Sequence, residues 1–303
     1  MLRIFLLLFL FPVVTGCTPN YTILEHRDLN MTATGDRPTI VIEMMHGPIT
    51  VTTANGKEIS GQLTVRGVGV DKEEAEKEIK AIDFDIKPDV DGKILIKATR
   101  TDGSKHWNNS GTEATLQVPA SSKLELITAN SSILVTGRNQ GVIAKTTNGS
   151  VSIKQSASSV YVQSSNGAVT CNDVVGPANI ETSNAAITLT GKQMLLNCKS
   201  SNGSIKFAGD LIPGNHKLQT SNSHINVTLP QNACMSLSAS TSNGRITNDF
   251  KLTKVGSKNS KTNLEGEIGE GDASNTNLTL KTSNSSIAIK RSKNTKQLEI
   301  DTE

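Results

Sequence analysis

Residues able to do acid–base or metal chemistry are sparse in the middle of this chain. Hydrolysis of acidic polysaccharides, a chemistry found among proteins built from repeated strands, needs clustered carboxylates, with or without calcium. The spacing of the central acids forms no obvious pair, and the chain has no G-x-S-x-G, H-E-x-x-H or P-loop motif. The sequence therefore predicts no enzyme, no catalytic residue, no cofactor and no metal site. Between residues 128 and 250 the acids are Asp173, Glu181, Asp210 and Asp249.

The cysteines point to covalent chemistry at one position only. Cys171 and Cys198 fall in apolar positions of the repeat described below, so we expect them to be small core side chains that form no mutual disulfide. No C-x-x-C pair occurs, which argues against the common redox and zinc motifs. Cys17 differs from them because an apolar segment leads directly to it.

Residues 1–16 have the composition of a secretory signal peptide. Arg3 precedes an apolar run from Ile4 to Val14, which is too short for an ordinary membrane span. The ending VTGC at Cys17 resembles a bacterial lipobox. This resemblance implies cleavage before Cys17, a diacylglycerol on its sulfur and stable membrane anchoring, since each buried methylene contributes about 0.8 kcal/mol. An ordinary cleaved signal, with Cys17 left as a spare thiol, is the alternative.

The expected location follows from the same segment. Thr18 stands where an Asp would resemble an inner-membrane retention signal, so we expect an exported lipoprotein of the outer membrane, on its surface or its periplasmic face. Residues 17–38 are interpreted as the lipidated cysteine and a polar tether. A net charge of +3 without a concentrated basic run, together with 3% aromatic residues, argues against a nucleic-acid partner.

One short phrase, typified by TTNGSV and SSNGSI, recurs through most of the chain. Its asparagines are first spaced by 18 residues, then by 20 and 21, and the last step of 41 equals two repeat lengths. Fixed self-similarity of this kind is typical of a solenoid or an array. The asparagines are Asn130, Asn148, Asn166, Asn184, Asn202, Asn222, Asn243 and Asn284.

The apolar residues around each asparagine define two strands per repeat. Pairs with period 2 lie three and five residues after it, as at Val151 and Ile153, and six and four residues before it, as at Val160 and Val162. The sequence thus predicts an all-β protein, a parallel β-solenoid (β-helix-like) with coils of about 18–21 residues, two short strands in each. His216 falls in an apolar column and is interpreted as a tolerated edge residue.

The phrase itself is interpreted as turn chemistry. Asn and Gly both tolerate a positive φ, and the Asn side chain can bond to nearby backbone. Repeated at one height per coil, the eight asparagines could also stack as an amide ladder, a structural role that we prefer to direct ligand binding.

The regions on either side of the central repeats contain insertions. Strands resume at Thr39, and ANGKEI (54–59) carries a version of the phrase. Residues 71–82 predict the single α-helix, capped by Asp71 with Glu74 in a capping box. The loop that holds His106 and Trp107 is interpreted as a cap over the core, with ligand contact as the alternative. The domain so defined is 39–290, with a hairpin excursion at 251–275 and a polar tail at 291–303.

The order of lipobox, strands, Glu/Lys-rich helix and repeated coils resembles the bacterial putative-adhesin domain over roughly residues 39–290. The resemblance rests on phrases such as TTNGSV, SSNGAV, TSNAAI and KTSNSSIAI, together with LEGEIGEG near the end. It implies a β-solenoid of undefined biochemical function and brings no catalytic motif.

Three functions remain open at this point. The favoured one is a lipid-anchored, non-enzymatic cell-envelope protein that is used for adhesion or surface interaction, with a glycan or protein ligand on the solenoid face. The positive excess at Lys145, Lys154, Lys199, Lys206 and Arg245 would favour acidic polymers. A periplasm-facing scaffold or assembly factor is the alternative, and a polysaccharide-active β-helix enzyme is the second alternative.

Overall fold

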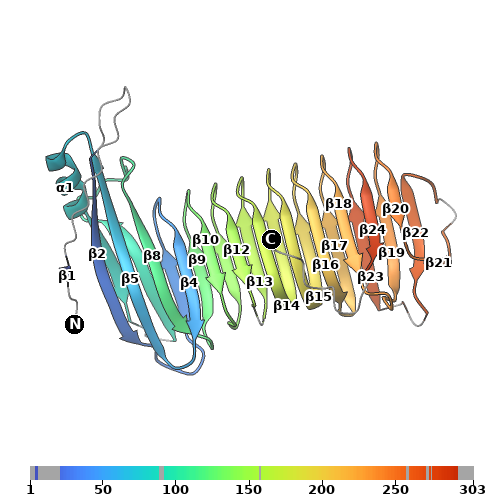
Figure 1. Cartoon of the computed structure of the whole chain (residues 1–303), viewed down its shortest axis with the longest axis horizontal. Coiled ribbons are helices and arrows are strands. Elements are labelled where there is room, and N and C mark those ends of the chain that lie inside the picture. The colour runs from blue at the N-terminus through green and yellow to red at the C-terminus, as the bar shows by residue number, and fades with distance from the viewer. Residues whose placement is uncertain are drawn as a thin grey trace. The chain divides into compact units, whose positions relative to one another are not determined.

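The computed structural model describes residues 4–5, 21–88, 92–156, 158–256, 259–270, 273 and 275–292. The chain forms two compact units, Met1–Gly149 (unit 1) and Ser150–Glu303 (unit 2). Strands dominate both units, and the described residues contain one helix, α1 (Lys72–Ala81) (Figure 1). The predicted all-β solenoid with one inserted helix is confirmed.

In unit 2 each coil contributes one strand to each of two parallel rows. The row that follows the phrase contains residues three to six positions after each asparagine, and the row that precedes it contains residues six to three positions before. The strands are β12 (Val151–Lys154), β13 (Val160–Ser164), β14 (Val169–Thr182), β15 (Ile187–Lys199), β16 (Ile205–Leu211), β17 (Gly214–Gln219), β18 (Ile225–Leu229), β19 (Met235–Ser240), β20 (Ile246–Asn248), β23 (Thr276–Lys281) and β24 (Ile287–Arg291). Two long strands, β14 and β15, continue through the corner between the two rows and so belong to both.

The columns predicted to point inward are buried. Ile187 pairs with Val169 on one side and with Ile205 on the other, and all three side chains are at most 1% exposed. Each aliphatic side chain buried in this way contributes about 1.5–3 kcal/mol. A single coil could bury only one face of its strands, so the columns stabilise the coils collectively.

The order of the coils in space differs from their order in the sequence. β24 pairs in parallel with β18 and with β20, and β23 pairs in parallel with β17 and with β19. The last coil of the chain therefore lies between the coils of Asn222 and Asn243, as the red β24 between β18 and β20 shows in Figure 1. The 41-residue step is not two stacked repeats, and the interpretation by length was wrong.

The residues of the excursion close the open end of unit 2. β22 (Asn263–Ile268) pairs antiparallel with β19, from Met235↔Ile268 to Ser240↔Asn263. β21 (Leu252–Thr253) pairs antiparallel with β22 in turn. Without this pairing, the outer edge of β19 would leave backbone N–H and C=O groups unpaired and open to strands of other chains. The antiparallel strand β22 pairs with that edge.

Unit 1 is also built from two rows of parallel strands, and one of its coils also lies out of sequence order. β3 (Thr39–Glu43) pairs in parallel with both β7 (Lys93–Arg100) and β9 (Lys123–Ile127). β4 (Ile49–Ala54) likewise lies between β8 (Gly111–Pro119) and β10 (Ile133–Thr136) (Figure 1). β11 (Val142–Lys145) pairs with β9. The early strands thus belong to the solenoid, but not in sequence order.

Antiparallel strands also cap unit 1. β5 (Glu58–Gly69) covers β8, and β2 (Tyr21–Thr32) pairs with β5 along its whole length. The prediction of a polar tether over 17–38 was therefore wrong for residues 21–32. Only Leu29 is buried in this strand, so its composition gives little apolar signal, and the backbone pairing with β5 holds it.

The predicted helix lies against this cap. Asp71 accepts a hydrogen bond from the Glu74 N–H (2.8 Å), and the Glu74 carboxylate accepts one from the Val70 N–H (2.7 Å). Ala75 and Ile79 are buried, and an added Cβ at Gly67 or Gly69 would meet the helix at Ala75. β6 (Ile82–Lys87) follows directly and pairs antiparallel with β7.

Candidate functional site

The eight repeated asparagines lie on exposed turns and bond to one another across coils. In unit 1 the Asn148 Nδ2 donates to the Asn130 Oδ1 at 2.6 Å. In unit 2 the same bond links six asparagines at 2.6–2.8 Å, in the order 166, 184, 202, 222, 284 and 243. We call these residues the asparagine ladder. Most of its side-chain amides donate a hydrogen bond to the neighbouring coil, which gives the ladder a structural role.

A row of buried hydroxyls lies behind the ladder. The Thr or Ser two positions before each asparagine is buried, and where the bond is described its hydroxyl donates to a turn carbonyl of the next coil. Thr220 Oγ1 donates to the Gly203 O at 2.9 Å, and Ser200 Oγ to the Ala185 O at 3.2 Å. The turn backbones also bond, as from the Asn202 N–H to the Ser183 O at 2.8 Å. The phrase therefore supplies three kinds of hydrogen bond between coils: from the asparagine amide, from the buried hydroxyl and from the turn backbone.

The glycine of the phrase is needed for close approach, not for a positive φ. Gly149, Gly203 and Gly244 have no positive φ, but a Cβ at each would collide with a turn carbonyl of the neighbouring coil. The asparagines have no positive φ either. The prediction that the turn uses left-handed residues was wrong, because the turns are held by bonds between coils.

Left-handed residues occur at the opposite corner of the coil. Gln155 (φ 64°), Asp173 (φ 56°) and Gln193 (φ 51°) lie there. The Asp173 N–H donates to Thr190 Oγ1 at 3.0 Å. Asp173 thus has a structural position at the corner, where a short polar residue tolerates the left-handed conformation.

In the coil of β3 and β4, a histidine occupies the position of the asparagine. Ile133 pairs with Ile49, so Asn130 corresponds to His46, and Thr128 Oγ1 donates to the Gly47 O at 3.1 Å as its counterparts do. The predicted copy at 54–59 instead forms the turn between β4 and β5. Ile49 and Val51, three and five residues after His46, were the signal that could have identified it.

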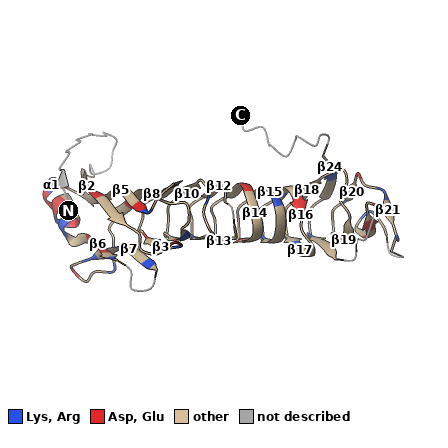
Figure 2. Cartoon of the chain, turned by 90° about the horizontal axis from the view of Figure 1, so that it is seen from below, with Lys and Arg blue, Asp and Glu red and all other residues tan. Residues whose placement is uncertain are grey.

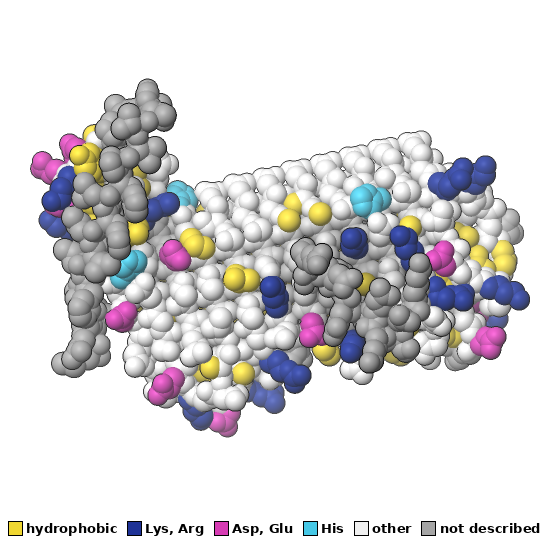
Figure 3. Space-filling view, viewed as in Figure 1, with side chains coloured by type: hydrophobic (Ala, Val, Ile, Leu, Met, Phe, Trp, Pro, Cys, Tyr) yellow, Lys and Arg dark blue, Asp and Glu magenta, His cyan; other side chains and the backbone are white. Residues whose placement is uncertain are grey.

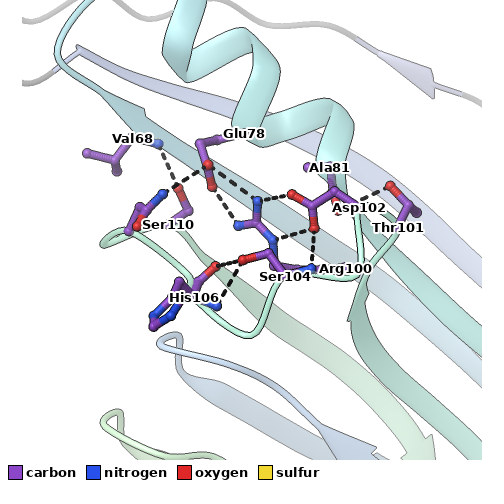
Figure 4. A network of polar contacts seen from close by, with 10 residues as sticks. Val68, Glu78, Ala81, Arg100, Thr101, Asp102, Ser104, His106 and Ser110 are labelled. Atoms are coloured by element: carbon purple, nitrogen blue, oxygen red, sulfur yellow. Dashed lines mark hydrogen bonds and ion pairs between the residues drawn. The ribbon is translucent and has the colours of Figure 1, made fainter.

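His46 contacts a polar cluster at the capped end of unit 1. The Trp107 ring lies edge-on to His46 (centroids 6.4 Å apart), and the Arg100 guanidinium lies 5.9 Å from the Trp107 centroid. Trp107 is 9% exposed, so it packs as part of the cap. Arg100 Nη1 donates to Glu78 Oε2 (2.7 Å), and its Nη2 to Asp102 Oδ2 (2.6 Å) (Figure 4).

The two carboxylates of this cluster share one cation, Arg100. Burial raises the pKa of Glu78, but the hydrogen bonds and the charge of Arg100, with bonds from Ser110 and Asn108, more than offset this and leave the pKa below its ordinary value. Asp102 accepts a hydrogen bond from Arg100 and a second from the Ser104 N–H. These bonds, the first more than the second, lower the pKa of Asp102 to about 2. Both carboxylates are therefore ionised at neutral pH and serve as partners of Arg100, which leaves neither as a general acid.

The other candidate acids are not brought together. Glu181 pairs with Lys199 (3.3 Å), Asp210 Oδ2 accepts from the Gln193 N–H (2.9 Å), and Asp249 Oδ2 accepts from the Arg291 N–H (3.3 Å). Among the described residues, no group of three or more His, Cys, Asp or Glu side chains could hold a metal ion.

The basic residues of the central coils do not form one patch. In unit 2, Lys199 lies in the row that precedes the phrase, Lys206 in the row that follows it, and Arg245 beside the turn. Along the coils of unit 2, charged positions are separated by uncharged ones (Figure 2), and the face in Figure 3 is mainly uncharged and polar. Lys145 belongs to unit 1.

Three titratable side chains in the core of unit 2 have structural roles. Cys171 and Cys198 are buried and free, as expected, and burial raises the pKa of both thiols, that of Cys198 to about 12. His216 is 1% exposed, so its prediction as an edge residue was wrong. Its Nδ1 accepts from the Leu196 N–H (3.2 Å), and its Nε2 donates to the Ile212 O (2.9 Å). Two backbone partners allow this polar ring in the core.

Cys17, the predicted lipid-attachment residue, lies outside the described residues. So does the predicted signal peptide apart from β1 (Ile4–Phe5), which pairs antiparallel with β2. The predicted tail is described only at Arg291 and Ser292. Within the described residues, no helix combines the length and apolar character needed to cross a membrane.

Comparison with known proteins adds a family and two distant structures. A family model described as Toastrack DUF4097 matches residues 38–290. No curated protein matches the chain. A putative cell adhesion protein from Clostridium sporogenes ATCC 15579 is similar at 10% identity and a TM-score of 0.29, covering 88% of this chain and 100% of that one. A putative adhesin from Bacteroides fragilis NCTC 9343 is similar at 12% identity and a TM-score of 0.35, covering 89% and 97%.

Proposed function

We infer that this chain, which belongs to the Toastrack DUF4097 family, is a non-enzymatic protein of the cell envelope that interacts with other surfaces in the manner of an adhesin. The match over residues 38–290 confirms the family that the sequence resembled. The observation that carries the proposal is the asparagine ladder with its buried hydroxyl row. Together they fix successive coils at one height and hold their outer faces in a regular array.

The described chemistry supports binding over catalysis. Among the described acids of unit 2, Glu181, Asp210 and Asp249 each have a separate structural partner, and in unit 1 Glu78 and Asp102 are both partners of Arg100. Outward side chains on the strand rows are mostly uncharged and polar, as at Asn179 and Asn197, whose amides bond at 3.2 Å. Such faces suit many weak polar contacts with a glycan or a protein. Anchoring through a lipid on Cys17 is part of the proposal.

Protease treatment of intact cells tests where the protein acts. Cells that produce the wild-type chain are compared with cells that produce Cys17→Ala, with a periplasmic protein as the internal control. Digestion of the wild-type chain, while the control protein survives, supports a surface role. Protection of the wild-type chain until the cells are permeabilised contradicts it, and would favour the periplasm-facing scaffold. Release of the C17A chain from the membrane fraction is expected if the lipid anchors the protein.

A further inference from the structure

The chain contains five Asn–Gly dipeptides, at Asn55, Asn148, Asn166, Asn202 and Asn243. This dipeptide can convert its amide to an acid without an enzyme. A hydroxide ion removes the proton of the glycine N–H, and the nitrogen attacks the asparagine Cγ. The new C–N bond closes a succinimide, and the side-chain nitrogen leaves as ammonia. Water then opens the ring at either carbonyl, which gives aspartate or isoaspartate.

The asparagine ladder obstructs this reaction at four of the five positions. The attacking nitrogen is held by the buried hydroxyl row: Gly203 N–H donates to Ser200 Oγ at 2.9 Å, and Gly167 N–H to Ser164 Oγ at 3.1 Å. Gly149 and Gly244 donate to Thr146 and Thr241 at 3.2 and 3.1 Å. Gly149, Gly167 and Gly203 are buried, so hydroxide has little access to their N–H groups. The asparagine amides are also held by bonds between coils.

Asn55 and Gly56 lie in a different environment. They form the exposed turn between β4 and β5, and Gly56 has a φ of +108° with no heavy atom within 4 Å of an added Cβ. Among the described residues, neither the Asn55 amide nor the Gly56 N–H has a hydrogen-bond partner. The glycine nitrogen is therefore open to hydroxide, and the turn has room for the ring.

We propose that Asn55 is a site of spontaneous deamidation and that the asparagine ladder protects the other four Asn–Gly dipeptides. The reaction adds a carboxylate next to Lys57, whose Nζ pairs with Asp36 at 3.0 Å. The isoaspartate product also adds a methylene to the backbone of the β4–β5 turn. The modification thus changes the charge and the path of one exposed turn in unit 1 and leaves the coils intact.

Peptide mass spectrometry of the aged protein tests the proposal. The folded full-length chain is incubated in mildly alkaline buffer, and a matched sample is incubated in denaturant. Digestion with trypsin places Asn148 in the peptide of residues 146–154 and Asn202 in that of residues 200–206, while Asn55 is in the peptide that ends at Lys57. In the folded sample we expect Asn55 to convert several times faster than Asn148 and Asn202. In denaturant the three rates should converge.

Two variants separate the parts of the proposal. Asn55→Gln should remove the acidic product from the peptide that ends at Lys57, which assigns the signal. Ser200→Ala should speed conversion of Asn202 but not of Asn148 in the folded protein, with retained β-structure checked by circular dichroism. Equal rates at Asn55, Asn148 and Asn202 in the folded wild type would overturn the proposal, and so would an unchanged Asn55 beside converted ladder residues.

Discussion

Asn243 Nδ2 donates a hydrogen bond to Oδ1 of Asn284 at 2.8 Å, and Asn284 Nδ2 donates to Oδ1 of Asn222 at 2.7 Å. The residue that comes last in the sequence is therefore the middle one of the three. Thr241 Oγ1 donates to the Ser285 O, and Thr282 Oγ1 to the Ser223 O, both at 2.8 Å, which gives the same order. The final coil of the chain is an interior coil of unit 2.

Substitutions in the final coil should therefore behave like core substitutions. Ile287 is 0% exposed, as is Ile187 in a central coil, while Ile246 is half-buried in the outer coil. We expect Ile287→Ala and Ile187→Ala each to lower the free energy of unfolding by about 2–5 kcal/mol. Ile246→Ala should cost clearly less. Urea unfolding of the three variants measures these free energies. A small loss of stability for Ile287→Ala beside a large loss for Ile246→Ala would contradict the observed coil order.

The hydrogen bonds of the asparagine ladder should contribute to the stability of the folded protein. Asn202 donates to Asn184 (2.7 Å) and accepts from Asn222 (2.6 Å), so Asn202→Ala removes two hydrogen bonds, worth about 1–2 kcal/mol in the free energy of unfolding. Asn232→Ala, at an exposed asparagine outside the ladder, is the matched control and should leave the midpoint of urea unfolding unchanged. Equal midpoints for the two variants would show that the ladder adds no stability.

The Arg100 cluster should make unit 1 sensitive to acid. Because the pKa values of Glu78 and Asp102 lie below their ordinary values in the folded state, their contribution is full above the unfolded pKa values of 4.5 and 3.8. It is lost as pH falls through the folded pKa values, since the unfolded chain then binds more protons. Denaturant unfolding at decreasing pH should show this loss.

Replacement of Arg100 should reverse the dependence of stability on pH. Arg100→Leu leaves the buried Glu78 carboxylate without its cation, which costs about 3–5 kcal/mol at neutral pH. Burial then raises the Glu78 pKa, so the variant should regain stability as pH falls and Glu78 is protonated. Asp36→Asn, which removes an exposed ion pair with Lys57, is the control and should have little effect. An unchanged acid profile in R100L would contradict this role.

His216 should limit the stability of unit 2 at mildly acid pH. Burial lowers its pKa below 6.5, and the bond to the Ile212 O only partly counters this. As pH falls below 6.5, the unfolded histidine is protonated first, so stability should fall until the folded pKa is reached. His216→Leu should remove that decline and cost stability at higher pH by leaving the Leu196 N–H without its acceptor. A decline that persists in H216L would assign it to another group.

The sequence determined the structure within each coil. Period-2 apolar pairs such as Val151 and Ile153 fixed the two strands and their buried face, and the spacing of the asparagines placed them at one height. Asp71 and Glu74 marked the start of the helix. These signals are local, because a strand alternates its side chains and a helix needs a cap wherever it packs. The cysteines could also be recognised as core residues from their columns.

Only the tertiary structure decided which coils are neighbours and what closes the ends. Nearly every coil presents the same aliphatic columns and the same turn. The residues around Asn284 would therefore fit at the end of the stack, beyond Asn243, as well as between Asn222 and Asn243. The connecting segments decide the order, and they carry no repeat. The cap strand β2 has one buried side chain and is held by pairing with β5, residues 58–69. Such long-range backbone pairing leaves little trace in residue types, which is why residues 21–32 were predicted as a tether and not as a strand.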